Sequence, residues 1–287
     1  MKPDLLTELQ QKMPGFSKGQ KKIAAYLIEH FDKAAYITAA KLGNVVGVSE
    51  STVVRFASEI GFDGYPKLQE ALQEVSRNML TAVQRMEVAS SSINADDVLS
   101  KVLHSDIEKI RKTLEEISKD DFDRAVDSII NAKNIYVIGT GSALALSNFL
   151  SFYLNHIFDN VKPVVSTSIS DVFENIIPIS KDDVLIGLSF PRYSKRTAKA
   201  MKYAHDCGAN VIAITDSAAS PISKFADHLL IARSDMASFV DSLVAPLSLI
   251  NALIVSLGIR RKEEVYKKLS KLENLWQENE VYGNIKL

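Results

Sequence analysis

The chain has 287 residues, and its 34 lysines and arginines nearly balance its 35 aspartates and glutamates, which gives a net charge of −1. Hydrophobic residues make up 46% and charged residues 24%, as in an ordinary globular protein, and this length suggests about two domains. The single cysteine, Cys207, excludes an internal disulfide and fits a reducing compartment, so we expect a cytoplasmic protein. The polar first residues, MKPDLLTELQQKMPGF, do not have the pattern of a signal peptide.

One uncharged segment, residues 242–259, approaches the lower length limit for a membrane span. It reads SLVAPLSLINALIVSLGI, and Pro246, Asn251 and the serines weaken a membrane interpretation. A helix that is apolar on all sides is more often buried in a core or in an interface. We therefore expect a buried helix here, packed against a partner subunit, and no association with a membrane.

The first 75 residues have the pattern of short helices. Ser17 and Gln20 form a capping-box pattern at the start of one helix. Thr38 begins a second helix, which is followed by a tight turn at Gly47. Ser49 is a suitable N-cap for a third helix, ESTVVRFASEI, which ends before a glycine. The residues expected to form the buried stripe of this third helix are Val53, Phe56 and Ile60.

Two short helices joined by a tight turn are typical of a helix-turn-helix, in which the second helix reaches base edges in the major groove. The exposed side of that helix carries Ser51, Thr52 and Arg55, whose side chains can contact bases or phosphates. The first 75 residues carry nine positive and nine negative side chains, so the DNA-binding hypothesis rests on pattern and not on charge. A plain helical hairpin is the alternative.

The middle of the chain continues the helical pattern. Residues 66–92 are expected to form one helix that ends in the serine-rich patch Ser90–Ser92, which is the best linker candidate. Two more helices are expected over residues 96–119 and 120–132. The predicted division is an all-α helix-turn-helix domain over 1–77, a helical linker over 78–132 and an α/β domain over 133–287.

Beyond residue 132 apolar strands alternate with helices, which is typical of a parallel sheet covered on both faces. The five expected strands lie in the segments NIYVIGTG, VKPVVSTS, DVLIGLS, ANVIAITD and DHLLIA. We predict a doubly wound, flavodoxin-like α/β domain with a five-stranded parallel sheet. In such a fold, ligands bind beyond the carboxyl ends of the strands, where the strand order reverses.

The first expected strand ends in Gly139, Gly141 and Ser142, which open the following helix. Glycines permit a close approach to the backbone, and a helix N-terminus favours an anion. A dinucleotide site would need a glycine where Leu144 stands and an acidic residue after the second strand, so a nucleotide is disfavoured. A tight turn without a ligand is the other alternative.

The third expected strand ends at Ser189, and Ser194 and Thr197 follow it in the stretch SFPRYSKRT. Four more hydroxyl-bearing residues follow the second strand, namely Ser166, Thr167, Ser168 and Ser170. Because the carboxyl ends of parallel strands meet at one edge, we expect these loops to lie together. Each hydroxyl can donate a hydrogen bond to a phosphate oxygen, so the sequence predicts an anion site at this edge.

Nearly the whole chain resembles one family. The stretch GVSESTVVRFASEIGFDGYPKLQ is similar to the DNA-binding domain of the RpiR family of bacterial transcriptional regulators. That family also has a C-terminal SIS (sugar isomerase) domain, which binds phosphosugars. The residues that the resemblance implies in DNA binding are Ser49, Ser51, Thr52, Arg55 and Lys67, with Lys18 as a further phosphate contact.

The ligand loops of a SIS domain usually run GxGxS and SxSGxT, and this sequence departs from the second pattern. Ser189 and Ser194 occupy its first serine and its threonine, but Pro191 and Arg192 replace the inner serine and glycine. Ala143 stands where many members have a second serine. We therefore predict a variant site in which Arg192 grips a phosphate or a carboxylate; a solvated turn residue is the alternative. The predicted effector-binding residues are Gly139, Gly141, Ser142, Ser189, Arg192, Ser194 and Thr197.

An isomerase would need a placed base, and the available candidates belong to no motif. They are Glu174, His156, His205 and His228. SIS domains joined to a DNA-binding domain more often sense than catalyse. We therefore expect a non-enzymatic transcriptional regulator, without cofactor or metal, whose operator binding responds to a phosphosugar or sugar acid and which controls genes of carbohydrate metabolism.

The expected partners follow from this interpretation. They are double-stranded operator DNA, the phosphosugar or sugar-acid effector, and copies of the same chain in a homodimer or homotetramer. The first alternative is a phosphosugar isomerase with an accessory helical domain. The second is a nucleotide-binding protein.

Overall fold

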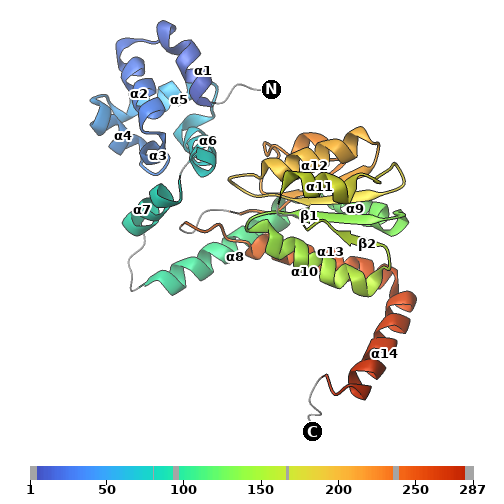
Figure 1. Cartoon of the computed structure of the whole chain (residues 1–287). Helices are drawn as coiled ribbons and strands as arrows, with labels where there is room; N and C mark the ends of the chain where they lie inside the picture. The colour runs from blue at the N-terminus through green and yellow to red at the C-terminus, as the bar shows by residue number, and fades with distance from the viewer. Residues whose placement is uncertain (1–4, 80, 93–96, 166–167, 235–238, 282–287) are drawn as a thin grey trace. The chain divides into compact units, whose positions relative to one another are not determined.

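A computed structural model describes residues 5–79, 81–92, 97–165, 168–234 and 239–281. The chain folds as two compact units, Met1–Ser92 and Ile93–Leu287. The first unit is helical, and the second is built on a parallel sheet (Figure 1). The predicted fold class is thereby confirmed.

The first unit consists of short helices around one apolar core. They are α1 (Leu5–Lys12), the 3₁₀ turn η1 (Met13–Gly15), α2 (Lys18–Glu29), α3 (Phe31–Ala34), α4 (Ala39–Val46), α5 (Glu50–Glu59), α6 (Gly64–Met79) and α7 (Ala82–Ser92). The predicted stripe of α5 is buried as expected and meets Leu27 of α2, Leu42 of α4 and Leu68 of α6 in one cluster. The burial of this stripe fixes which side of α5 faces solvent.

The turn between α4 and α5 depends on two glycines. Gly47 ends α4 with φ of +71°, a left-handed conformation that costs glycine nothing. A side chain at Gly43 would bring its Cβ within 2.8 Å of the carbonyl oxygen of Val48, so only glycine lets the turn close onto α4. The predicted N-caps are confirmed, because Thr38 and Ser49 each accept the backbone N–H of the third residue after them.

Helix α6 belongs to this unit because its side chains satisfy carbonyl groups near the end of α3. Tyr65 donates its hydroxyl to the carbonyl of Ile37 at 2.8 Å, and the amide of Gln69 donates to the same carbonyl at 2.9 Å. Gln73 donates to the carbonyl of Ala35 at 3.0 Å. These bonds supply partners for backbone groups that the short α3 leaves unpaired.

The single helix predicted over residues 66–92 is wrong. Helix α6 ends at Met79 and α7 begins at Ala82. Thr81 and Gln84 form a reciprocal cap, in which the backbone N–H of each residue donates to the side chain of the other at 2.9 and 3.3 Å. This capping pair starts a new helix and was not recognised in the sequence. The Ser90–Ser92 patch lies in α7, and the boundary between the two units falls directly after it.

The second unit begins with α8 (Val98–Glu116) and α9 (Lys119–Asn131), which lead into the sheet. Its strands are β1 (Ile135–Gly139), β2 (Val161–Pro163), β3 (Val184–Leu188), β4 (Asn210–Thr215) and β5 (His228–Ile231). All neighbouring strands pair in parallel, in the order β2-β1-β3-β4-β5, as predicted for a flavodoxin-like sheet. The other elements are α10 (Ala143–Ile157), α11 (Ile169–Ile176), α12 (Lys195–Asp206), η3 (Ser223–Phe225), α13 (Val244–Arg260) and α14 (Lys262–Glu278).

Both faces of the sheet are covered, because successive residues of a strand point to opposite sides. In β1, Ile135 and Val137 pack with α9, α10 and α13 in one cluster. Tyr136 and Ile138 pack with α11 and α12 in another cluster. Figure 1 shows α10 and α13 on one side of the sheet and α11 and α12 on the other. Helix α9 thus contributes to the core of the sheet domain, which differs from the helical linker proposed for residues 78–132.

The apolar segment at residues 242–259 is α13, and its inner side is buried within its own chain through Leu249, Ile250, Leu253 and Leu257. Its outer side remains exposed, with Ile259 70% accessible. Among the described residues, no single helix is long and apolar enough to cross a membrane. Helices α13 and α14 reach the required length only together, and the chain bends by 99° between them.

The buried hydroxyl of Tyr65 gives the first testable prediction. Tyr65→Phe should lower the free energy of unfolding by about 1 kcal/mol at pH 7, because the carbonyl of Ile37 loses its hydroxyl donor. Burial, reinforced by the neighbouring Tyr26, raises the pKa of Tyr65 to about 12. The hydroxyl contribution should therefore be complete below pH 10 and disappear as the pH rises through 12. Urea denaturation of the full chain, followed by circular dichroism, measures the loss of stability and its pH dependence. Equal stability of the wild-type protein and Tyr65→Phe at pH 7 would contradict the predicted contribution of the hydroxyl.

Candidate functional site

The start of α5 presents a cluster of hydroxyl groups. Ser49 caps the helix by accepting the backbone N–H of Thr52 at 3.3 Å. Its Oγ also lies 2.9 Å from Oγ of Ser51 and 2.8 Å from Oγ1 of Thr52. The cap leaves Ser49 and Ser51 exposed and Thr52 half-buried at the end of the helix that would enter a DNA groove.

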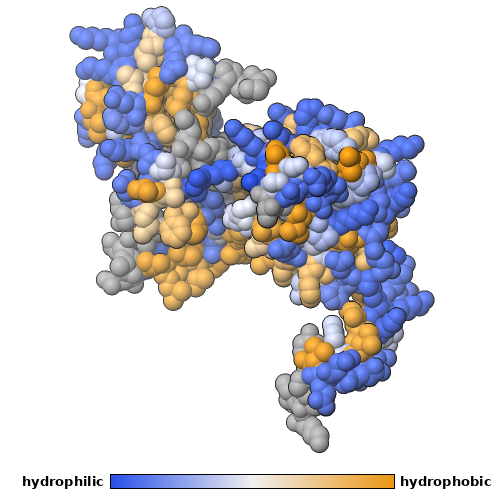
Figure 2. All heavy atoms as spheres, in the orientation of Figure 1, coloured by the Kyte–Doolittle hydropathy of each residue, from blue (hydrophilic) through white to orange (hydrophobic). Residues whose placement is uncertain are grey.

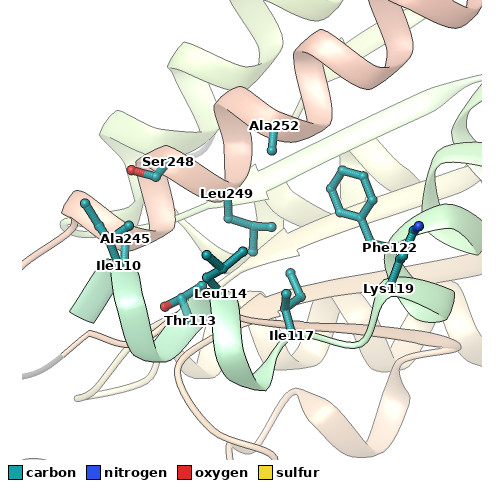
Figure 3. Close-up of a pocket in the computed structure, with 10 residues that line it drawn as sticks. All are labelled: Ile110, Thr113, Leu114, Ile117, Lys119, Phe122, Ala245, Ser248, Leu249 and Ala252. Carbon is teal, nitrogen blue, oxygen red and sulfur yellow. The ribbon is translucent and has the colours of Figure 1, made fainter. Parts of the chain in front are cut away.

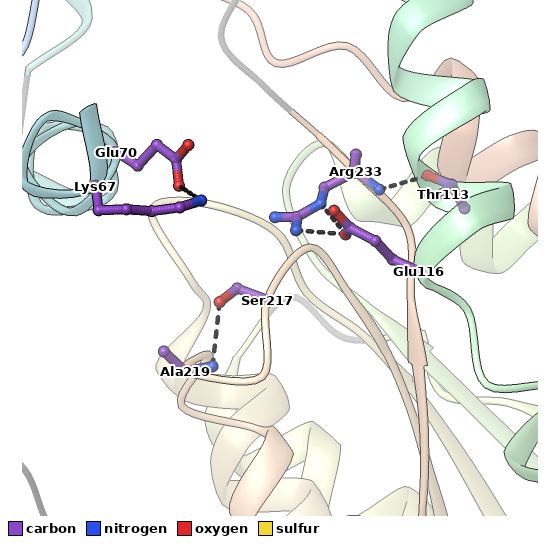
Figure 4. A network of polar contacts seen from close by, with 7 residues as sticks. All are labelled: Lys67, Glu70, Thr113, Glu116, Ser217, Ala219 and Arg233. Carbon is purple, nitrogen blue, oxygen red and sulfur yellow. Dashed lines mark hydrogen bonds and ion pairs between the residues drawn. The ribbon is translucent and has the colours of Figure 1, made fainter. Parts of the chain in front are cut away.

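Arg55 lies one turn further along α5 and is exposed on the side opposite the buried residues Val53 and Phe56. The structure thus brings four of the five predicted DNA-binding residues together on α5 and its cap. The fifth, Lys67, is exposed on α6, where its ammonium lies 2.7 Å from a carboxylate oxygen of Glu70 (Figure 4). A surface pair of this kind is weak and does not prevent Lys67 from binding another anion.

In the second unit, the loops after β1 and β3 lie side by side at the carboxyl edge of the sheet. The two strands pair directly, with Gly139 opposite Leu188 at their ends. Oγ1 of Thr140, in the first loop, lies 3.3 Å from Oγ1 of Thr197, which is fully buried in the first turn of α12. This contact joins residues 57 positions apart and places both loops at the reversal of strand order.

The two glycines of the first loop have different roles. A Cβ on Gly139 would lie 2.5 Å from the carbonyl oxygen of Ala143, so this glycine permits α10 to start close to β1. Gly141 has φ of +63° and open space around its Cβ position. Ser142 is exposed and makes no side-chain cap to α10, so the helix start offers backbone N–H groups and a free hydroxyl.

The hydroxyls of the second loop hold the loop in shape. Ser189 is 2% exposed, and its Oγ accepts the backbone N–H of Ser194 at 3.2 Å. Oγ of Ser194 accepts the N–H groups of Arg196 and Thr197 at 3.2 and 3.4 Å, which caps α12. Both oxygens act as hydrogen-bond acceptors within the loop, so each hydroxyl O–H can still donate a hydrogen bond. A hydrogen-bond donor is what an anion requires.

Arg192 stands at the tip of this loop with φ of +62° and an exposed side chain. Only two described residues other than glycine have a positive φ, and the second is Glu280 at the end of α14. A left-handed backbone costs a residue with a side chain about 1 to 2 kcal/mol. Strain of this kind is concentrated at functional sites, so the conformation supports a ligand-binding role for Arg192.

The serines after β2 are only partly described, because Ser166 and Thr167 lie outside the described residues. Ser168 caps α11 by accepting the N–H of Asp171 at 3.2 Å. Ser170 donates its hydroxyl to Glu174 at 3.2 Å. Glu174, one of the candidate bases, is exposed and already engaged in this bond.

The three candidate histidines of the second unit do not lie at the carboxyl edge. His156 and His205 belong to the last turns of α10 and α12, and His228 begins β5. Each of the two helices starts at the carboxyl edge of the sheet and ends at the amino edge, and a strand begins at the amino edge. All three histidines therefore lie at the edge opposite the hydroxyl-bearing loops. His228 pairs with Oγ of Ser128 at 3.0 Å, and burial lowers its pKa. The described residues hold no group of three His, Cys, Asp or Glu suited to a metal ion.

The segment after β5 is tied to α8, the helix that opens the second unit. The backbone N–H of Arg233 donates to Oγ1 of Thr113 at 2.9 Å, and its guanidinium pairs with Glu116 (Figure 4). Ser242 donates its hydroxyl to Asp106 of α8 at 2.6 Å. These bonds connect α8 to a loop that leaves the carboxyl edge of the sheet.

Comparison with known proteins assigns both units. The helix-turn-helix domain of the rpiR family matches residues 3–78, and the SIS domain matches residues 128–256. The chain belongs to the RpiR family. An uncharacterized HTH-type transcriptional regulator of Clostridium perfringens is 25% identical to this RpiR-family regulator over 227 residues, which is 79% of this chain and 80% of the relative.

Two solved structures are similar in fold to this RpiR-family protein. The sugar isomerase domain of an RpiR transcription factor from Sphaerobacter thermophilus has a TM-score of 0.59 and 26% identity, covering 62% of this chain and 99% of that chain. The Vibrio vulnificus NanR protein, complexed with ManNAc-6P, has a TM-score of 0.60 and 22% identity, covering 98% of this chain and 100% of that chain. The likeness to the Vibrio protein shows the fold alone.

The structure of the RpiR-family protein adds three residues to the edge that the sequence interpretation missed. Thr140 contacts Thr197, and the hydroxyl of Tyr193 donates to the buried carboxylate of Asp216 at 2.9 Å. Asp216 follows β4 in the way that Ser189 follows β3. The rule that polar residues gather at carboxyl ends of strands therefore pointed to Asp216 as well. No sequence signal pairs it with Tyr193.

Proposed function

We propose that this RpiR-family regulator binds operator DNA through α5 and senses an anionic sugar, a phosphosugar or a sugar acid, at the carboxyl edge of its SIS domain. The observation that carries the proposal is the contact between Thr140 and Thr197, which unites the two hydroxyl-bearing loops at the reversal of strand order. The ManNAc-6P held by the Vibrio protein, which shares the fold, supports a sugar phosphate as the first ligand to test.

On the DNA side, the proposed contacts are the five residues described above. Ser51 and Thr52 would reach bases or phosphates from the start of α5, and Arg55 would bind guanine or a phosphate. Ser49 would act mainly through the cap that orders this end of the helix. Lys67 would contribute a backbone contact from α6.

On the effector side, the proposed ligands combine backbone and side-chain donors. The start of α10 would bind the anion through N–H groups at Gly141 and Ser142, while Gly139 keeps the helix close to β1. Ser189 and Ser194 would donate their hydroxyl protons, with Thr197 behind them. Arg192 would form a bidentate pair with a phosphate or carboxylate group.

We infer that the signal passes through α8, since this helix follows the DNA-binding unit in the sequence and is bound to the loop after β5 through Thr113, Glu116 and Asp106. An effector can shift operator binding only if it prefers one of two arrangements of the protein. The effector would prefer one arrangement if the contacts between α8 and the loop after β5 differ between the two.

We further propose a homodimer assembled through α8 and α13. The exposed side of α8 carries an apolar stripe at helical spacing, formed by Leu99, Leu103, Ile107, Ile110 and Leu114. Figure 2 shows hydrophobic residues gathered over this part of the surface. A cavity of about 480 Å³ lies between Ile110 and Leu114 of this stripe and the first half of α13, where Leu249 and Ala252 line it (Figure 3). Its mainly apolar lining suits side chains of a second copy and does not suit a charged sugar.

A phosphosugar isomerase remains the second candidate function, because SIS domains also occur in isomerases. The position of the three histidines at the edge opposite the hydroxyl loops disfavours it. Turnover of an aldose or ketose phosphate by the purified chain, abolished by Glu174→Gln, would favour the isomerase instead.

The two proposed sites predict separable variants. Arg55→Ala should weaken binding of a DNA duplex selected by the wild-type protein by about tenfold or more, and leave effector binding unchanged. Arg192→Ala should weaken binding of the effector by a similar factor and leave DNA affinity without effector unchanged. Fluorescence anisotropy measures DNA binding, and thermal shift with sugar phosphates and sugar acids measures effector binding. Each variant is the control for the other; a wild-type protein that binds no duplex contradicts the regulator proposal.

The proposed dimer has its own test. Leu114→Glu places a charge on the most exposed residue of the α8 stripe, where Leu114 is 77% accessible, and should convert the dimer to a monomer at micromolar concentration. Lys112→Gln, also on α8 and also a change of one charge, should leave the dimer intact. Sedimentation velocity distinguishes the species. A monomeric wild-type protein, or a Leu114→Glu variant that stays dimeric, would refute this interface.

A further inference from the structure

The DNA-binding unit has balanced charges in its sequence, yet the structure separates paired from unpaired cations. Lys12 lies 2.6 Å from Glu8, and Lys67 lies 2.7 Å from Glu70. A second set is exposed and forms no ion pair with any described residue. This set consists of Lys18, Lys21 and Lys22 on α2, Lys33 on α3, Lys41 on α4 and Arg55 on α5. Five of these six cations lie on α2, α4 and α5, the three helices around the turn.

Helix α2 lies directly against the turn and the start of α5. A Cβ on Gly19 would be 3.6 Å from Cγ1 of Val48 in the turn and 3.8 Å from Cγ2 of Thr52 on α5. The side-chain amide of Gln20 donates to the carboxylate of Glu59 at the other end of α5. The first turn of α2 therefore runs beside α5 in the folded unit.

Lys22 reaches the turn itself. Its ammonium nitrogen lies 3.7 Å from the position that a Cβ would occupy on Gly47, two residues before the cap of α5. Lys18 precedes Gly19 and is exposed at the start of the same helix. Lys22 thus lies at the turn before α5, and Lys18 begins the helix whose next residue, Gly19, lies beside Thr52.

In a helix-turn-helix complex, the start of the second helix contacts base edges, and the residues around it face the backbone at the rim of the groove. A lysine ammonium is a compact point charge that suits a phosphate oxygen without demanding a fixed geometry. Neither lysine would have to break an ion pair with a described residue in order to bind a phosphate.

We propose that Lys22, together with Lys18, binds backbone phosphates and extends the DNA-binding surface from α4 and α5 onto α2. The inference rests on the proposed function and deepens it, because it adds Lys22 to the interface and makes α2 a positioning element. It also explains how a unit whose first 75 residues carry equal numbers of positive and negative side chains presents a local positive surface to DNA.

The test is the salt dependence of DNA binding by the full-length protein. The probe is a duplex of about 30 base pairs selected by the wild-type protein from a random pool. The slope of log affinity against log salt should fall in magnitude by about 0.9 for Lys22→Gln and again for Lys18→Gln, because each variant loses one phosphate contact. The preferred sequence should not change, since phosphate contacts carry no direct sequence information.

Lys12→Gln is the matched control, because it removes one exposed lysine from α1, where that lysine already pairs with Glu8. Its slope should equal that of the wild-type protein. A wild-type slope for Lys22→Gln, in a variant whose circular dichroism is unchanged, would overturn the inference and leave the proposed function standing. Failure of the wild-type protein to select or bind any duplex would overturn the proposed function and this inference with it.

Discussion

The parallel pairing of β1 with β3 is the constraint on which the proposed effector site depends. Because β2 lies outside β1, the strand order reverses between β1 and β3, and the loops that follow both strands open at the same place. Two glycines let the helices pack closely against these strands. Gly139 lets α10 start against β1. Gly187 of β3 leaves room for Met201 of α12, whose sulfur would lie 2.2 Å from a Cβ added to this glycine. The two helix starts are thereby held against the sheet, and Thr140 meets Thr197 across the gap.

The chemistry of this edge differs from that of a plain phosphate cradle. The hydroxyl oxygens of Ser189 and Ser194 accept backbone N–H groups of the loop, and both hydroxyl protons can be donated to a ligand while these bonds stay in place. Tyr193 is anchored to the buried Asp216, while its neighbour Arg192 adopts the left-handed conformation at the exposed tip. This combination of an anchored residue beside a strained one supports the proposal that the loop binds an anion. Phosphate and carboxylate both satisfy that description, and the sugar attached to them sets the remaining contacts.

Much of this could be predicted from the sequence because local rules govern it. The N-caps at Thr38 and Ser49, the turn at Gly47 and the five strands follow from short-range patterns. The division of residues 66–92 into two helices was missed because Thr81 and Gln84 form an inconspicuous cap. The pairing of Tyr193 with Asp216, the approach of Lys22 to the turn and the α8 stripe depend on tertiary packing, and no single-sequence pattern encodes them.

The central claim is that an anionic sugar at the sheet edge and DNA at α5 are thermodynamically coupled. The most direct test is calorimetric titration of the effector into the full-length protein, alone and with a saturating selected duplex. Coupling requires the effector affinity to change by the same factor by which the effector changes DNA affinity, typically about 5- to 150-fold. An effector affinity that changes severalfold when DNA is bound, by the factor that the effector imposes on DNA affinity, would establish the coupling. An effector affinity that is identical with and without DNA would contradict it.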